Sequence, residues 1–322
     1  MKFDNQRLGR TLALVSLCLL EAVCSISGGN EPSHIAVVAA AESQLTFATA
    51  EQAGHALYAA ARSQDKQELE QILGPDSKAI LNSGDAGEDR ASLTSFVAKY
   101  DRMNRWSTMM DGSQILYVGA DNYPYPIPLV QNGSSKWYFD TATGKDEILA
   151  RRIGSNELLA IDAVSAMGRA EEIYYKHRYG DRNSHQYAML ILSTPGKKDG
   201  LYWTISNDEP ASPLSRLDEL AKDVVSSTQP GDSPILDGYS FRVLPAQENN
   251  AEHGAKNDLD GDARTKDFAI LATPVRYGDS GIMTFVMNKD GVVYEKDLGS
   301  RTVELANHMD RYDPDKSWTA VE

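Results

Sequence analysis

The spacing of apolar residues in the first half of the chain changes from a helical repeat to an alternating one. From Gln44 to about Arg105, apolar side chains recur every three or four residues, which predicts amphipathic helices. Three short apolar runs follow and predict strands at Gln114–Val118, Ile127–Val130 and Lys136–Phe139. Asn132-Gly133 lies between the last two runs and predicts a hairpin turn.

The second half repeats this order, with one long helix before several strands. Asn156-Glu157 is predicted to open the helix. Its expected buried stripe consists of Ile161, Val164, Met167, Gly168, Tyr174 and Tyr175, whereas Glu157, Arg169, Glu171 and Glu172 are expected in solvent. Four strands are then predicted at Tyr239–Leu244, Phe268–Thr273, Ile282–Met287 and Val292–Glu295. The simplest arrangement is a helix packed on an antiparallel β-meander.

Together these elements predict an α+β protein of two domains. The first, residues 44–152, has N-terminal helices and a small curved antiparallel sheet. The second, residues 153–322, has the long helix and the meander. By element order alone, the first domain resembles small cone-shaped folds of the nuclear-transport-factor-two type. Such a cone would enclose a cavity for a small molecule.

Residues 1–41 have the pattern of an export signal. Lys2, Arg7 and Arg10 precede an apolar run, Thr11–Leu20, that is too short to span a bilayer. Ala39-Ala40-Ala41 fits the small-residue rule for cleavage, so we expect export to the periplasm or the cell exterior. An uncleaved N-terminal anchor is the alternative.

Both cysteines, Cys18 and Cys24, lie in this leader. Cleavage after Ala41 would leave a body without disulfides or cysteine nucleophiles. Lipidation at Cys24 is a further alternative. Glu21, Ala22 and Val23 fit it poorly, because leucine is usual three positions before a lipoprotein cysteine.

Charge excludes two classes of partner. The chain of 322 residues has 32 Lys and Arg against 46 Asp and Glu, a net charge of −14. A surface this acidic repels nucleic-acid phosphates and anionic lipid, so nucleic acid is not an expected partner. We also expect no transmembrane segment in the mature chain, because its apolar runs are too short.

Four long segments resemble a family of exported bacterial proteins catalogued as domain of unknown function 2950. They are Phe139–Ile161, Leu192–Trp203, Gly238–Gln247 and Tyr277–Gly299. The resemblance covers nearly all of the mature chain and implies an envelope protein without an assigned activity.

The second half also resembles type IV pilin-like modules, in which a helical stem precedes a sheet. The matching positions are Asn156, Glu157, Gly238-Tyr239-Ser240-Phe241, Ala272-Thr273-Pro274, Gly281, Phe285 and Gly291-Val292. Pilins need a long apolar stem, whereas Arg151 and Arg152 precede the helix predicted here. The resemblance therefore implies a module used outside a standard filament, and convergent patterning of a helix and a meander is the alternative.

Two motifs suggest chemistry. Gly278-Asp279-Ser280-Gly281 matches the nucleophile segment of trypsin-like proteases, but no histidine has the matching setting, so we interpret it as a polar turn. Asp258, Asp260 and Asp262 alternate as in a calcium-binding loop and are the candidate metal ligands. Ala263 and Ala269 occupy the positions where that loop needs Gly and Glu. We therefore expect no cofactor, with calcium as the alternative, and no catalytic residue is predicted.

Two hypotheses about function follow. In the first, the chain is a non-enzymatic envelope protein that binds or scaffolds another envelope protein. In the second, the cone-like first domain binds or hydrolyses a small molecule. A deep pocket with a charged pair at its base would favour the second hypothesis, and a filled core with a flat apolar face would favour the first.

Overall fold

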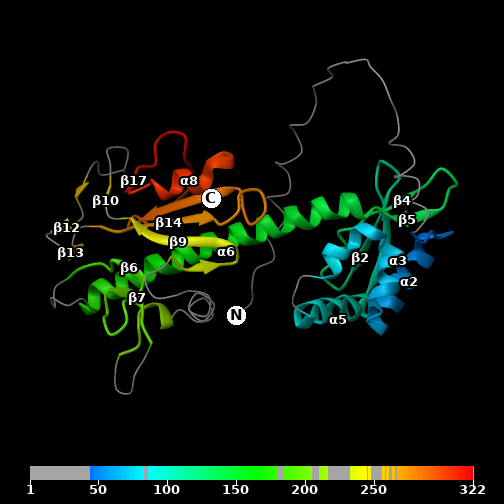
Figure 1. Ribbon diagram of the computed structural model, residues 1–322, viewed down its shortest axis with the longest axis horizontal. Helices are drawn as coiled ribbons and strands as arrows, with labels where there is room; N and C mark the ends of the chain where they lie inside the picture. Colours follow the sequence, from blue (N-terminus) through cyan, green and yellow to red (C-terminus); the bar gives the residue numbers. More distant parts are fainter. Residues whose placement is uncertain are drawn as a thin grey trace, which may run out of the picture.

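The computed structural model places most of the chain in two bodies joined by one long helix (Figure 1). It describes residues 44–82, 86–179, 185–204, 210–216, 233–244, 246–247, 256–257, 259–260, 263–264 and 267–321. The predicted signal segment, residues 1–41, lies outside the described residues. The joining helix, α6, spans Thr141–His177 and has 37 residues, which corresponds to a length of about 55 Å.

Helices come first in the N-terminal body, as predicted. They are α2 (Ala50–Ser63), α3 (Lys66–Leu73), η2 (Pro75–Ser77), α4 (Lys78–Leu81) and α5 (Ala86–Arg102). The Thr49 side chain accepts a hydrogen bond from the amide of Gln52 and caps α2, while Asp65 caps α3 in the same way through Glu68. Short polar caps therefore set the start of each of these two helices.

A five-stranded antiparallel sheet packs against these helices. Its strands are β1 (Asn104–Thr108), β2 (Gln114–Val118), β3 (Tyr123–Pro124), β4 (Leu129–Gln131) and β5 (Trp137–Phe139). The order is β1-β2-β4-β5, and β3 pairs with β2. Buried side chains fill the space between helices and sheet; they include Leu57, Leu69, Ile72, Leu73, Ile127, Leu129 and Phe139.

The predicted hairpin turn joins β4 to β5, but its strained residue is not the glycine. Ser135 has a φ of 56°, and Gly133 has no positive φ. The Asn132 carboxamide oxygen accepts the amides of Ser134 and Lys136, both at 3.0 Å. This side-chain turn holds the loop, so the asparagine contributes more to its geometry than the glycine does.

Helix α6 begins fifteen residues before the predicted start at Asn156, and that prediction is wrong. Asp140 caps it by accepting the amide of Thr143, and Thr141 donates its hydroxyl to the carbonyl of Leu73. The first four turns contain few buried side chains, so an apolar repeat could not reveal them.

The C-terminal body is built on a six-stranded antiparallel sheet. Its order is β18-β16-β15-β14-β9-β8. The bounds are β8 (Ile235–Leu236), β9 (Tyr239–Leu244), β14 (Ala269–Pro274), β15 (Met283–Asn288), β16 (Val293–Asp297) and β18 (Thr319–Ala320). Four of these strands were predicted, and the antiparallel meander on a long helix confirms the α+β class.

Side chains alternate between the two faces of this sheet. Phe241, Ile270 and Phe285 point to α6 and meet its buried stripe, which includes Ala163, Val164, Met167 and Tyr174. Leu244, Leu271 and Val286 occupy the opposite face with Ala306 of α8 (Thr302–Asn307) and Tyr312. The sheet is therefore covered on both faces.

Short elements complete the described fold. They are β6 (Leu190–Leu192), β7 (Gly200–Tyr202), η3 (Leu214–Arg216), β10 (Ala246–Gln247), β11 (Lys256–Asn257), β12 (Leu259–Asp260), β13 (Ala263–Arg264), η4 (Gly299–Arg301) and β17 (Arg311–Tyr312). Among the described helices, none has a stretch that is both long and apolar enough to cross a membrane.

Gly144 gives a direct test of how α6 docks on the N-terminal body. A Cβ there would lie 2.6 Å from Ile127 Cγ1 and 3.0 Å from its Cα, so backbone would have to move. We expect Gly144→Ala to lower the free energy of unfolding by about 1–3 kcal/mol, measured by urea denaturation. Gly168→Ala is the matched control, because its Cβ would meet the mobile end of Met287. Equal decreases in the free energy of unfolding for the two variants would contradict this packing of Gly144 on Ile127.

Candidate functional site

The predicted calcium ligands cannot be placed together. Asp258 and Asp262 lie outside the described residues, and only the backbone of Asp260 is described, in β12 opposite Ala263. Within the part of the chain that the structure describes, no three His, Cys, Asp or Glu side chains gather closely enough to hold a metal ion. The calcium site therefore stays a prediction.

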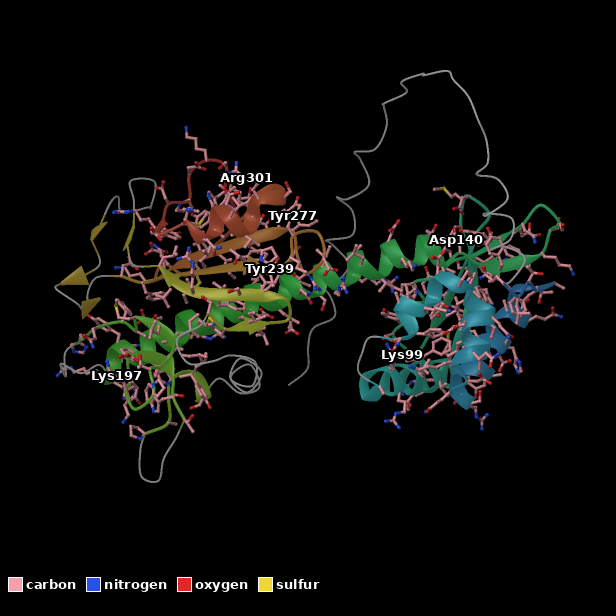
Figure 2. All side chains as sticks on the ribbon, viewed as in Figure 1. Lys99, Asp140, Lys197, Tyr239, Tyr277 and Arg301 are labelled. Atoms are coloured by element: carbon pink, nitrogen blue, oxygen red, sulfur yellow. The ribbon has the colours of Figure 1, made fainter. Side chains whose placement is uncertain are left out.

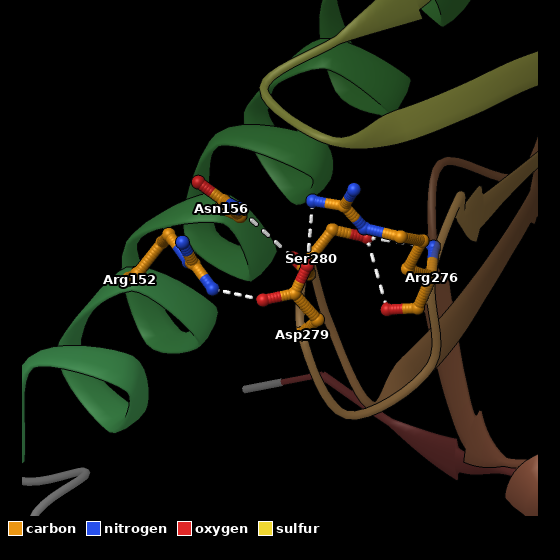
Figure 3. Close-up of polar contacts among 5 residues, drawn as sticks. All are labelled: Arg152, Asn156, Arg276, Asp279 and Ser280. Atoms are coloured by element: carbon orange, nitrogen blue, oxygen red, sulfur yellow. Dashed lines mark hydrogen bonds and ion pairs between the residues drawn. The ribbon is translucent and has the colours of Figure 1, made fainter. Parts of the chain in front are cut away.

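The Gly-Asp-Ser-Gly motif forms a tight turn that packs against helix α6 (Figure 3). The Ser280 hydroxyl donates to the carbonyl of Arg276 at 3.1 Å and accepts the amide of Arg276 at 3.0 Å. Ser280 is only 7% exposed. The Ser280 hydroxyl thus links the end of the turn to both backbone groups of Arg276 at its start.

The described histidines have other partners. His185 contacts Arg178 and the carbonyl of Tyr175, and His308 contacts the carbonyl of Glu304. His55 and His177 pack on tyrosine rings. A serine nucleophile needs a histidine base within hydrogen-bond reach. The hydrogen bonds given above for the Ser280 hydroxyl are instead to the backbone of Arg276. This agrees with the interpretation of the motif as a polar turn.

Three side chains of α6 hold this turn and the strand after it. The Asn156 amide donates to the carbonyl of Ser280 at 2.9 Å. One oxygen of Glu157 accepts the amides of Ile282 and Met283, at 2.9 and 3.0 Å. Arg152 makes an ion pair with Asp279. We call Arg152, Asn156, Glu157, Asp279 and Ser280 the clasp.

Glu157 was expected in solvent, but it is half-buried at the clasp beside a second carboxylate, Glu295 of β16. Burial and the negative charge of Glu157 raise the pKa of Glu295. Burial and the same two carboxylates raise the pKa of Tyr239, whose hydroxyl donates to the carbonyl of Met283 at 2.8 Å. Glu157 of the clasp and Glu295 therefore form a like-charge pair next to a buried phenol. Tyr239 and Tyr277 both lie in the C-terminal body (Figure 2).

Glu171, expected in solvent, is fully buried, and that prediction is wrong. It lies on the α6 stripe four residues after Met167, and its carboxylate accepts the amide of Ala188 at 2.8 Å. Asp267 is also fully buried and accepts the amide of Phe268, and its other oxygen lies 3.5 Å from the Lys289 ammonium. Sequence reasoning missed both, because no pattern distinguishes an acid that binds a backbone amide from a solvated one.

Aromatic rings cover these buried acids. The Tyr187 ring stacks on Tyr175 with centroids 4.6 Å apart and meets Phe268 edge-on at 5.1 Å. Burial raises the pKa of Tyr187, and Glu172 and Asp267 add to the effect. Trp203 is buried in the same core and donates its indole N–H to the carbonyl of Pro210. This cluster is part of the buried core of the C-terminal body.

An open depression of about 360 Å³ lies on the N-terminal body, between α5 and the turn after β2. Its lining includes Lys99, Arg102 and Asp121. The Lys99 ammonium lies 3.4 Å from an Asp121 oxygen and 4.4 Å from the centre of the Tyr123 ring. The lysine is thus already engaged, and the depression is a surface feature outside the core.

The clasp is tested by removing the acceptor at Glu157. Glu157→Ala leaves the amides of Ile282 and Met283 without this acceptor, so we expect a loss of about 1–3 kcal/mol in the free energy of unfolding. Glu157→Gln keeps a side-chain oxygen and should stay within about 1 kcal/mol of the parent chain. Urea denaturation measures both. A loss in Glu157→Gln as large as in Glu157→Ala would contradict an acceptor role.

The pair of carboxylates gives a dependence on pH. Because the pKa of Glu295 is raised on folding, its contribution to stability is complete below its unfolded pKa of about 4.3 and is lost as pH rises through its folded pKa. We expect Glu295→Gln to be more stable than the parent chain at neutral pH, by about 0.5 kcal/mol, and the difference to vanish near pH 4. Urea titrations from pH 4 to 8 measure it. If Glu295→Gln instead had a lower free energy of unfolding than the parent chain at neutral pH, repulsion between Glu157 and Glu295 would be ruled out.

Comparison with protein-family models matches residues 44–321 to the family described as Protein of unknown function (DUF2950). Comparison with curated proteins gave no match, and comparison with solved structures gave none. The resemblance to type IV pilin-like modules therefore stays a prediction. The matched segment covers well over half of the chain, from before the first described helix to the last described strand, and the chain belongs to this family.

Proposed function

We propose that this chain is a non-enzymatic binding or scaffolding protein, exported to the periplasm or the cell exterior, whose two domains are held apart by one continuous helix. The domains are residues 44–152 and 153–322, and helix α6 is shared between them. The partner is another envelope component.

One observation carries this proposal: two consecutive arginines of α6 bind opposite bodies. Arg151 donates to the carbonyl of Pro124 in the N-terminal body at 2.7 Å, and Arg152 pairs with Asp279 in the C-terminal body. No flexible linker separates these contacts. A helix that continues from one core into the next acts as a spacer between them. This suits a scaffold better than an enzyme whose pocket lies within one domain.

Two further observations support a role without catalysis. The motif that resembled a protease nucleophile closes a turn and docks it on α6. The N-terminal core, where a cone would hold its cavity, contains fully buried Leu57, Ile72, Leu129 and Phe139. These buried apolar side chains support scaffolding over the alternative, a small-molecule or hydrolytic pocket in the N-terminal domain.

Export is tested by the N-terminus of the protein from its own host. We expect chains that begin near Glu42, recovered from the periplasm or the medium and identified by mass spectrometry of the intact protein. The control is a chain with Arg7→Glu and Arg10→Glu, which should stay in the cytosol at full length. Native protein that retains Met1 in the cytosol would overturn the proposal.

The spacer is tested with a second variant. Insertion of a flexible Gly-Ser segment between Ile153 and Gly154 should leave both bodies folded and uncouple them. If the helical connection between the domains matters, crosslinking in the envelope fraction should recover a reproducible partner with the parent chain and much less with the insertion. Equal recovery with both chains would contradict a spacer role.

A further inference from the structure

Three glycines of α6 differ in what surrounds them. A Cβ at Gly144 would collide with Ile127, and one at Gly168 would collide with the end of the Met287 side chain. Close approach of a neighbouring element therefore explains both. Around Gly154, by contrast, nothing lies within 4 Å of the Cβ position. A glycine in a helix interior without a packing role only weakens the helix.

Gly154 also lies where α6 passes from one body to the other. On the N-terminal side, Arg151 binds the carbonyl of Pro124. On the C-terminal side, Asn156 and Glu157 bind backbone groups of the segment Ser280–Met283. Gly154 is between these two sets of anchors, so bending there leaves every backbone anchor in place.

Among the described residues, an ion pair ties the segment before Gly154 to the C-terminal body. Arg152 pairs with Asp279, and Asp279 also pairs with Arg276 of its own turn at 2.6 Å (Figure 3). The side chains are 51% exposed at Arg152 and 37% exposed at Asp279. An exposed ion pair is weak and is screened by salt. It can therefore open at low cost without unfolding either body.

We propose that α6 bends at Gly154 and that the Arg152–Asp279 ion pair is a latch that holds the straight form. In the latched state the two bodies have the separation seen in Figure 1. In the open state the pair is broken, and the N-terminal body swings on the first turns of α6. The device does not depend on export or on any partner.

Spin-label distances between the two bodies test this proposal on the full chain. Cys18→Ser and Cys24→Ser remove the native thiols, and Met110→Cys and Val303→Cys add one exposed label to each body. Pulsed electron resonance should show two populations of distance. We expect Gly154→Ala to raise the ratio of latched to open molecules about three- to fivefold, because alanine favours the helix.

The latch is tested in the same background. Asp279→Asn should lower the latched-to-open ratio about two- to threefold, and 1 M salt should lower it in the parent chain but not in this variant. Ser155→Ala is the control at the neighbouring exposed position and should change the ratio much less than Gly154→Ala. One narrow distance distribution, unchanged by Gly154→Ala, Asp279→Asn and salt, would overturn the proposal.

Discussion

The arrangement of this protein depends on one constraint: helix α6 is too long to be stabilised by a single core and is therefore anchored in two. Its first turns are held by the Asp140 cap, by the Thr141 hydroxyl on Leu73 and by the close approach of Gly144 to Ile127. Its last five turns bury an apolar stripe on the C-terminal sheet. Isolated helical segments are marginal in water, so the stretch between the anchors remains helical because both ends are fixed.

The two ends of α6 are held by different kinds of interaction. The N-terminal anchor relies on capping, a small residue and short polar contacts, and it buries little apolar area of the helix. The C-terminal anchor combines apolar burial with the clasp, in which helix side chains bind backbone groups at the start of β15. Packing of the stripe fixes the helix on the sheet, and the clasp fixes where along the helix the strand begins. A directional contact is needed for the second task, because apolar packing alone tolerates sliding.

The sequence predicted those elements whose residues carry a regular apolar repeat. Strands β2 and β9 begin and end at the predicted residues, because an apolar run marks β2 and apolar and polar residues alternate along most of β9. The start of α6 was missed, since a capped and mostly polar segment has no stripe. The motif around Ser280 was correctly interpreted as a turn. Its partners on α6, however, are more than 120 residues away in sequence, and no spacing rule identifies contacts at that range.

The same limit explains why the burial of several acidic residues was not predicted, and it bears on the predicted calcium site. Glu157, Glu171 and Asp267 were expected in solvent or were not singled out, yet all three accept backbone amides. A carboxylate already bonded to amides, or paired with Lys289 as Asp267 is, has less free lone-pair capacity for a cation. In a chain of net charge −14, acidic residues are thus also structural acceptors, so alternation of aspartates alone is weak support for calcium. A metal site here would need acids that no backbone amide already uses.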